Sequence, residues 1–292
     1  MAKPCSPLRY PGGKSAIFGL VAELLKLNKL ERCDYAEPYA GGGGLALSLL
    51  FGGYVSEIHL NDIDASVWSF WKAVLDRTDD FIDLMYSTPV NMDTWHEQKH
   101  IQQKASASKP VELGFAAFFL NRVNRSGIIQ GAGVIGGKEQ TGNYLMDCRF
   151  NKPDLERRIR RIAKYRNRIH LYRNDAIAFM QEMARYPDST FLCIDPPYFN
   201  KGRKLYTSFY NPGDHADVAT QVLQLENPWI VTYDNVPEIQ ALYKTRRQFA
   251  FDINYSLQTK RIGTELLIAS KGLRVTESLR DEQLKPPARR AA

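Results

Sequence analysis

The stretch Tyr35-Ala36-Glu37-Pro38-Tyr39-Ala40-Gly41-Gly42-Gly43-Gly44 decides the fold. A short apolar strand at Tyr35-Ala36 runs into a glycine-rich turn, and an apolar helix follows from Leu45 to Phe51. A second strand from Glu57 to Leu60 then ends at Asn61-Asp62. A strand, a helix and a strand at this rhythm predict a parallel α/β fold.

The stretch Asp195-Pro196-Pro197-Tyr198 follows the apolar run Phe191-Leu192-Cys193-Ile194 and indicates a chemistry. An acid, two prolines and an aromatic residue at a strand end suit methylation of an exocyclic amino group on a planar ring. The acid can accept a hydrogen bond from the amine, and the carbonyl of Pro196 can point into a pocket because proline has a fixed φ and no N–H. The competing interpretation is a strand that ends in a proline-rich turn.

The turn and the acid after the second strand favour a nucleoside cofactor. The glycines let the backbone approach a ligand, and the next helix offers its N-terminal N–H groups. Asp62 follows about twenty residues later, where an acid typically binds ribose hydroxyls in α/β folds. The spacing is not the dinucleotide pattern, so Glu37-Pro38-Tyr39 suits a cofactor without a pyrophosphate. Taken singly, each feature also fits a tight turn or an acidic helix cap.

A segment near the N-terminus is similar to a P-loop but does not match its pattern: Arg9-Tyr10-Pro11-Gly12-Gly13-Lys14-Ser15. Leu8 stands where that pattern needs glycine, and no strand precedes it. Two interpretations remain. The segment is a Pro-Gly turn before a helix, or it is a lid that lays Tyr10 against a cofactor and brings Lys14 to an anionic group.

Composition favours a polyanionic partner. The chain has 292 residues, of which 44% are hydrophobic, so it can bury a substantial core. Lys and Arg outnumber Asp and Glu by 39 to 32, which gives a formal charge of +7. The four cysteines show no metal spacing, which is typical of reduced thiols in a cytosolic protein. No run approaches a membrane span and no signal-peptide core is evident, so we expect a cytoplasmic protein.

The strand rhythm predicts a catalytic domain in two parts, residues 1–75 and 151–272. Between them, residues 76–150 carry polar helical stretches and a glycine-rich tract, which predicts an inserted module. Residues 273–292 are polar and charged, and we expect a disordered tail. The strands expected in the second part are Ile169-Leu171, Phe191-Ile194, Trp229-Thr232, Phe249-Ile253 and Leu266-Ala269.

Four motifs in this order resemble the D12 class of N6-adenine-specific DNA methyltransferases: Tyr10–Lys14, Glu37–Gly43, Asn61-Asp62 and Asp195–Tyr198. The resemblance implies a Rossmann-like seven-stranded sheet with a mostly helical target-recognition insertion. It also implies S-adenosylmethionine as methyl donor, double-stranded DNA as substrate, and a prokaryotic or phage origin. The implied cofactor contacts are Tyr10, Lys14, Glu37, Tyr39, Gly41, Gly43, Asp62, Asp175 and Asp195. Asp175 could equally cap the helix that starts at Ala176.

The implied catalytic residues are Asp195, Pro196 and Tyr198. The adenine N6 amine is a poor nucleophile because its lone pair is delocalised into the ring. Asp195 and the Pro196 carbonyl would accept both of its hydrogens and favour a pyramidal nitrogen. The base must leave the duplex to reach them, and Tyr198 would then stack on it. The loop that follows holds Lys201 and Arg203, which suit closure over the flipped nucleotide.

Arg and Asn can read guanine and adenine edges through two hydrogen bonds. The predicted DNA contacts are Arg9, Arg122, Asn124, Arg125, Lys138, Lys201 and Arg203. Each could instead hold phosphates or cap helices. The tract Gly127-Ile128-Ile129-Gln130-Gly131 departs from the Asn-Gly pair of Dam-type enzymes, so GATC specificity is not expected from it.

Several alternatives stay open. N4-cytosine methylation uses the same amine chemistry, and a DNA-binding protein without catalysis could retain the fold. RNA or protein amide methylation fits the insertion less well. The sequence does not decide the recognition site, the biological role or the oligomeric state, for which a monomer is plausible.

Overall fold

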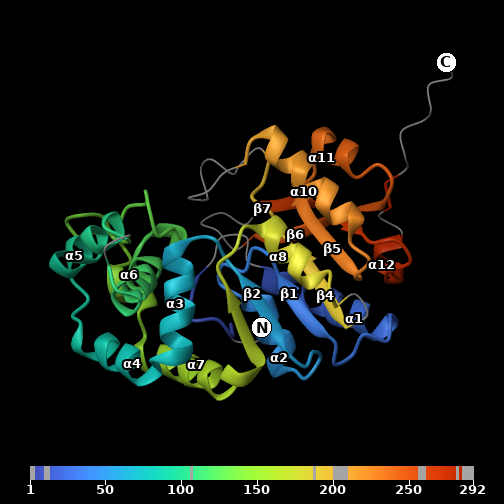
Figure 1. The fold of residues 1–292 in the computed structure, drawn as a ribbon. Coiled ribbons are helices and arrows are strands. Elements are labelled where there is room, and N and C mark those ends of the chain that lie inside the picture. The colour runs from blue at the N-terminus through green and yellow to red at the C-terminus, as the bar shows by residue number, and fades with distance from the viewer. Residues whose placement is uncertain are drawn as a thin grey trace.

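The computed structural model describes residues 4–9, 14–105, 108–186, 189–199, 210–255, 261–280 and 283–284, with 252–255 and 261–264 described by backbone alone. In this part, a seven-stranded sheet has the order β3-β2-β1-β4-β5-β7-β6 (Figure 1). Strands β1 to β5 pair in parallel, and β7 runs antiparallel between β5 and β6. The bounds are β1 Asp34–Glu37, β2 Ile58–Asn61, β3 Ile169–Tyr172, β4 Thr190–Ile194, β5 Trp229–Asp234, β6 Arg247–Tyr255 and β7 Arg261–Ala269. The predicted Rossmann-like α/β sheet and its seven strands are confirmed.

Helices cover both faces of this sheet, because each strand alternates its side chains between them. In β4, Phe191 and Cys193 pack into the core beneath α1 and α2, whereas Leu192 and Ile194 pack under α8, α10 and α11. The helices are η1 Lys14–Ile17, α1 Phe18–Leu27, α2 Gly44–Phe51, α3 Ala65–Asp76, α4 Thr78–Ser87, α5 Met92–Gln103, α6 Pro110–Val123, η2 Arg125–Gly127, η3 Met146–Arg149, α7 Lys152–Lys164, η4 Arg166–Arg168, α8 Ala176–Met183, α10 Pro212–Gln224, α11 Pro237–Leu242 and α12 Glu277–Arg280. None of the described helices combines the length and the apolar character that a bilayer crossing requires.

Residues 76–150 are mostly helical and lie to one side of the sheet (Figure 1). They share their core with α3. The Phe118 ring lies 6.0 Å from Phe70 and 5.4 Å from Phe81. Gly114 allows α6 to touch α3 because a Cβ at this position would lie 2.5 Å from the Ser69 carbonyl oxygen. The inserted helices therefore form one packed body with α3. The domain boundaries themselves stay a prediction.

The chain after residue 273 departs from the expected disorder over residues 273–280. Leu273, Val275 and Leu279 are at most 4% exposed and belong to the main core. Asn28 fixes the same segment, since its amide donates to the Arg274 carbonyl at 2.8 Å and accepts from the Arg274 N–H at 2.7 Å. Three apolar residues spaced among charged ones are enough to pack this stretch against the core. The polar and charged composition of the segment had predicted disorder instead.

Candidate functional site

The carboxyl ends of β1, β2 and β4 gather three acids at one edge of the sheet. Strand β1 lies between β2 and β4, and all three run in the same direction. Glu37 ends β1, while Asp62 and Asp195 directly follow β2 and β4. In open α/β sheets, this edge is where ligands bind. The sheet thus brings together acids that lie far apart in the sequence.

The glycine-rich turn after β1 is held in place by the side chain of Trp71. Gly41 and Gly43 have φ angles of +46° and +55°, which few other residues adopt readily. Trp71 of α3 donates its indole N–H to the Gly41 carbonyl at 2.9 Å. A Cβ on Gly43 would lie 2.9 Å from the Trp71 ring. The turn therefore presents bare backbone, and α2 begins immediately after it.

Asp62 fastens this turn to the end of β2. Its carboxylate accepts from the Gly41 N–H at 2.9 Å and from the Asp64 N–H at 3.0 Å. Burial raises the pKa of Asp62 to about 7 in spite of these two hydrogen bonds. A carboxylate has acceptor sites beyond the two in use. Asp62 can therefore shape the turn and still accept hydroxyl donors.

Glu37 and Tyr39 line the same turn in different ways. Glu37 is only 7% exposed and accepts from the Tyr35 hydroxyl at 3.0 Å. Burial raises its pKa to about 8. Tyr39 is half-buried, and its hydroxyl lies 3.0 Å from the hydroxyl of Tyr210, which precedes α10. Glu37 is therefore part of the buried interior of the fold, whereas Tyr39 connects the turn to the residues that precede α10.

Asp195 lies in a buried charge network centred on Lys14. The Lys14 Nζ is 3.0 Å from Asp195 Oδ1 and 3.0 Å from Glu265 Oε2. Thr232 of β5 donates its hydroxyl to the same Asp195 Oδ1 at 2.8 Å. Burial raises the pKa of Asp195, while the Lys14 ammonium opposes this rise. Both described contacts therefore fall on one oxygen of the acid.

Lys14 remains an ammonium ion in this setting. Burial alone would lower its pKa, but Asp195 and Glu265 outweigh burial and the net shift is upward. Its side chain is 8% exposed. Burying this cation is tolerated because two carboxylates and the Tyr198 hydroxyl, 3.0 Å away, surround it. The ammonium thus offsets part of the negative charge of the two carboxylates that it contacts.

Tyr198 is tied into the same network. Its hydroxyl donates to Glu265 and accepts from Lys14, and the residue is 5% exposed. The next backbone N–H, that of Phe199, donates to Asp234 at the end of β5 at 2.9 Å. Pro196 is buried between Asp195 and this anchored pair. The stacking of Tyr198 on a base stays a prediction, and it requires this ring to become accessible.

Two residues of this site were missed by sequence reasoning. Glu265 is 2% exposed and Thr232 is fully buried, and both contact the Lys14–Asp195 pair. Antiparallel pairing of β5 with β7 places Glu265 opposite Asp234. The signal for Glu265 was an acid at the head of the apolar run Leu266–Ala269, where a charge needs a buried partner.

Asp175 caps α8, as one of the two interpretations held. Its side chain accepts from the Ile177 N–H at 2.8 Å, and the residue is exposed. Its contact with a cofactor stays a prediction. Three other predicted residues, Tyr10, Lys201 and Arg203, lie outside the described residues.

Arg122 and Asn124 bind other parts of the protein in this structure, and their contact with DNA stays a prediction. Arg122 is 9% exposed, and its guanidinium donates to the Arg149 carbonyl at 2.7 Å and to the Pro7 carbonyl at 3.3 Å. Asn124 is 1% exposed and accepts from Trp95 at 2.8 Å. Sequence gives the residue type but not the direction of the side chain, and here both point inward.

Arg9, Arg125 and Lys138 remain as predicted DNA contacts in the described region. Arg125 and Lys138 are exposed, in the glycine-rich tract that follows α6. Arg9 is half-buried, and its guanidinium donates to the Asn124 carbonyl at 3.3 Å. The three residues therefore border the same loop, which begins at Asn124.

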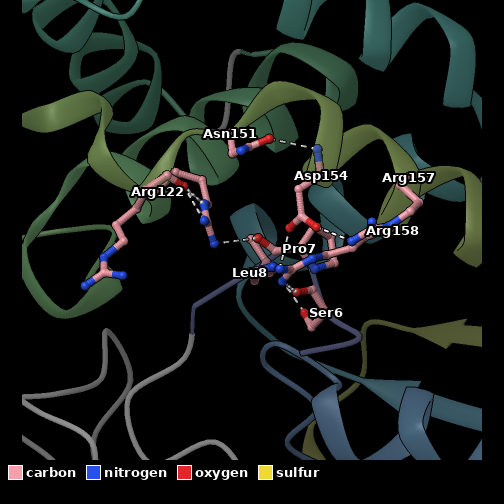
Figure 2. Close-up of polar contacts among 9 residues, drawn as sticks. Ser6, Pro7, Leu8, Arg122, Asn151, Asp154, Arg157 and Arg158 are labelled. Carbon is pink, nitrogen blue, oxygen red and sulfur yellow. Dashed lines mark hydrogen bonds and ion pairs between the residues drawn. The ribbon is translucent and has the colours of Figure 1, made fainter. Parts of the chain in front are cut away.

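The residues before Lys14 form a strap, Ser6–Arg9, clamped to the helical body. Arg158 donates to the Ser6 carbonyl at 2.9 Å, and Asp154 holds that arginine at 2.5 Å (Figure 2). Asn121 accepts from the Arg9 N–H and donates to the Arg9 carbonyl, both at 2.7 Å. Hydrogen bonds hold main-chain atoms along the strap, so the path of the chain is fixed as far as Arg9. Lys14, five positions later, begins η1.

Comparisons with known proteins identify a family for the chain. A family model of D12 class N6 adenine-specific DNA methyltransferases matches residues 10–259, which is most of the chain. No curated protein matches the chain. Among solved structures, a Pyrococcus horikoshii protein described as a candidate RNA methyltransferase aligns over 90% of this chain and 85% of its own, with 10% sequence identity and a TM-score of 0.41. A likeness this weak carries no argument about function.

Proposed function

The chain belongs to the D12 class of N6-adenine-specific DNA methyltransferases, and from that premise we propose that it transfers a methyl group from S-adenosylmethionine to the N6 amine of an adenine in double-stranded DNA. The observation that carries the proposal is the position of Asp195. This acid follows β4 at the ligand-binding edge of the sheet, and Lys14 and Thr232 both bind its Oδ1. The second carboxylate oxygen can then serve a substrate amine.

The turn after β1 fits a nucleoside cofactor. Gly41 and Gly43 take left-handed backbone angles directly before α2, and Asp62 binds the Gly41 N–H with acceptor capacity left for hydroxyls. We propose that Gly41, Gly43 and Asp62 hold the cofactor, with Tyr39 and Asp175 at its margin. The cofactor, when bound, supplies an electrophilic methyl group on sulfur.

Asp195 acts on the amine by accepting a hydrogen bond from one of its N–H groups, and the Pro196 carbonyl accepts a hydrogen bond from the other. The nitrogen then becomes pyramidal, and its lone pair is freed from the ring for attack. Such a site works by positioning and by fixed charges. Ionised Asp195 is an acceptor only, so the Lys14 ammonium supports the reactive form by opposing the rise in its pKa.

The target adenine must leave the duplex to reach Asp195, because its N6 lies inside the base stack. We propose that Tyr198 then packs on the base. Its hydroxyl is bound to Lys14 and Glu265, which holds the ring at a defined place beside the acid. Arg125 and Lys138, both exposed, are proposed to contact the DNA backbone next to the target.

The experiment is tritium transfer from labelled S-adenosylmethionine to duplex DNA, followed by digestion to nucleosides. We expect N6-methyladenine, and we expect Asp195→Ala to lose at least about 100-fold of the rate. Asp217→Asn, an exposed acid on α10, is the matched control and should keep full activity. Detection of N4-methylcytosine instead would show that the methylated base is cytosine. A fully active Asp195→Ala would refute the mechanism.

A non-catalytic protein gives a different pattern in the same experiment. It would bind DNA without any transfer of label, in wild type and in every variant. Calorimetry with S-adenosylmethionine then separates a protein that binds the cofactor from one that does not. Sedimentation of the wild type at the same concentrations measures the oligomeric state, which the sequence does not decide.

A further inference from the structure

Two histidines stack on the sheet away from the acids described above. His59 of β2 and His170 of β3 are register partners in neighbouring parallel strands, so both side chains lie on the same face. Their rings stack at 4.7 Å with planes 19° apart. Two imidazolium ions in this arrangement would repel each other. At least one ring is therefore neutral, which is the form that binds metal ions.

Carboxylates flank this pair on both sides. Glu57, just before β2, places Oε2 2.5 Å from His170 Nε2, and Asp34 at the start of β1 places Oδ2 3.8 Å from His59 Nε2. One ligand atom each from Glu57, His59 and His170 lies within 4.8 Å of the others. Among the described residues, these three form a group with metal-ligating atoms at such close range.

An outer contact orients His59. The Tyr172 hydroxyl lies 3.0 Å from His59 Nδ1, which leaves Nε2 as the nitrogen toward Asp34. Histidine ligands usually make this kind of hydrogen bond through the nitrogen that does not bind the metal.

The group can be reached from solvent. His170 and Tyr172 line an open cleft of about 440 Å³ along β3, which is the outermost strand of the sheet. The side chains of His170 and Glu57 are 39% and 41% exposed. An ion could therefore enter without any opening of the core.

We propose that Glu57, His59 and His170 bind a divalent transition-metal ion of the zinc type, with Asp34 as the nearest donor for a fourth position. Two imidazoles and a carboxylate suit zinc and cobalt, whereas magnesium and calcium prefer oxygen ligands alone. Ligands at zinc distances in a tetrahedron stand about 3.4 Å apart. Glu57 would move away from His170, and the rings would turn about χ2 to bring their nitrogens to this separation.

The ion would link β3, which lies at one edge of the sheet, to its neighbour β2. None of its proposed ligands takes part in the proposed methyl transfer, so the site and the proposed function can fail separately. Binding to the folded chain alone would raise the thermal midpoint, because the unfolded chain does not hold these ligands together.

The experiment uses the full chain without a histidine tag, first treated with a chelator. Titration with Co²⁺ is followed by visible absorption, and titration with Zn²⁺ is followed by calorimetry. We expect one ion per chain and a higher thermal midpoint with Zn²⁺. His59→Ala, His170→Ala and Glu57→Gln should each weaken binding at least 10-fold, with circular dichroism confirming that they fold. His100→Ala, an exposed histidine on α5, is the control.

The proposal is overturned by either of two results. The wild type could bind less than one Zn²⁺ per chain at millimolar metal, which would make the group a hydrogen-bonded polar cluster. Binding could also occur but survive in both histidine variants, which would place the ion elsewhere. If a histidine variant fails to fold, Glu57→Gln decides the outcome, because it keeps the shape of the side chain.

Discussion

Replacing Lys14 by Met would test the buried charge network directly. The substitution keeps an unbranched side chain but removes the ammonium that lies 3.0 Å from both Asp195 and Glu265. Two carboxylates would then face each other in a site from which water is mostly excluded. The variant therefore measures how far one cation stabilises the arrangement of these buried carboxylates.

The size of the effect follows from these distances. At 3.0 Å and an effective dielectric constant of about 20, each ion pair has a Coulomb energy of about 5 kcal/mol. Desolvation offsets part of this, and removing one partner of a buried pair costs about 3–5 kcal/mol net. We expect Lys14→Met to lower the free energy of unfolding by that amount at about pH 8. Lys72→Met breaks an exposed pair with Asp76 and should cost less than about 1 kcal/mol.

The loss should depend on pH with a defined sign. Burial raises the pKa of Asp195 and of Glu265, and Lys14 opposes both shifts. Without Lys14, both values rise further. A carboxyl group with a raised pKa stabilises the fold below its unfolded pKa, near pH 4, and loses this contribution as pH rises through the folded value. The deficit should thus be small near pH 4 and full near pH 8.

Urea denaturation at both pH values measures the deficit. Lys14→Met/Glu265→Gln also removes one of the two carboxylates that lose the ammonium, and it should recover part of the lost stability at high pH. A single variant within about 1 kcal/mol of wild type at pH 8 would refute the reasoning, because that is the size of an exposed pair. Equal deficits at both pH values would show that lost packing, and not charge, is the cause.

Three further predictions address the turn, the buried acid and the strap. Gly43→Ala places a Cβ 2.9 Å from Trp71 at a φ of +55°, so we expect a loss of about 1–3 kcal/mol and weaker cofactor binding by calorimetry. Gly53→Ala, at a φ of +72° with open space, is the control for backbone strain, and equal losses would contradict the steric argument. Glu37→Gln removes a carboxyl whose pKa is raised to about 8, so the stability of the variant relative to wild type should increase by at most about 4 kcal/mol between pH 4 and pH 8. Parallel pH–stability curves would contradict this. Asn121→Ala frees the backbone of Arg9 and should cost about 2–3 kcal/mol and expose the strap to limited proteolysis. Unchanged cleavage would show that Arg122 and Arg158 hold the strap without it.

The centre of the sheet could be predicted from the sequence because β4 and β5 are buried on both faces. Such strands read as short apolar runs between turn residues, as Phe191–Ile194 does before Asp195. The acids at the edge were predictable for the same reason, since each follows a strand. Local pattern and global fold agree at these positions.

The partners of those acids could not be predicted. Thr232 contacts Asp195, and Glu265 contacts Lys14, only through the order of β4, β5 and β7, which no local pattern contains. The direction of the Arg122 side chain could not be predicted either. Its side chain is long enough to face either solvent or the strap, and the strap decides the direction.

The strap and Lys14 also bear on how the protein is made. Lys14 leaves the ribosome early, yet its hydroxyl and carboxylate partners lie 184 and 251 residues downstream. The Arg9 backbone likewise waits for Asn121, 112 residues later. Closing loops of this length carries an entropic cost that only the finished contacts repay. The charge network around Lys14 is therefore completed by the last strands synthesised, and a truncated chain that ends before β7 leaves Lys14 without one of its two carboxylates.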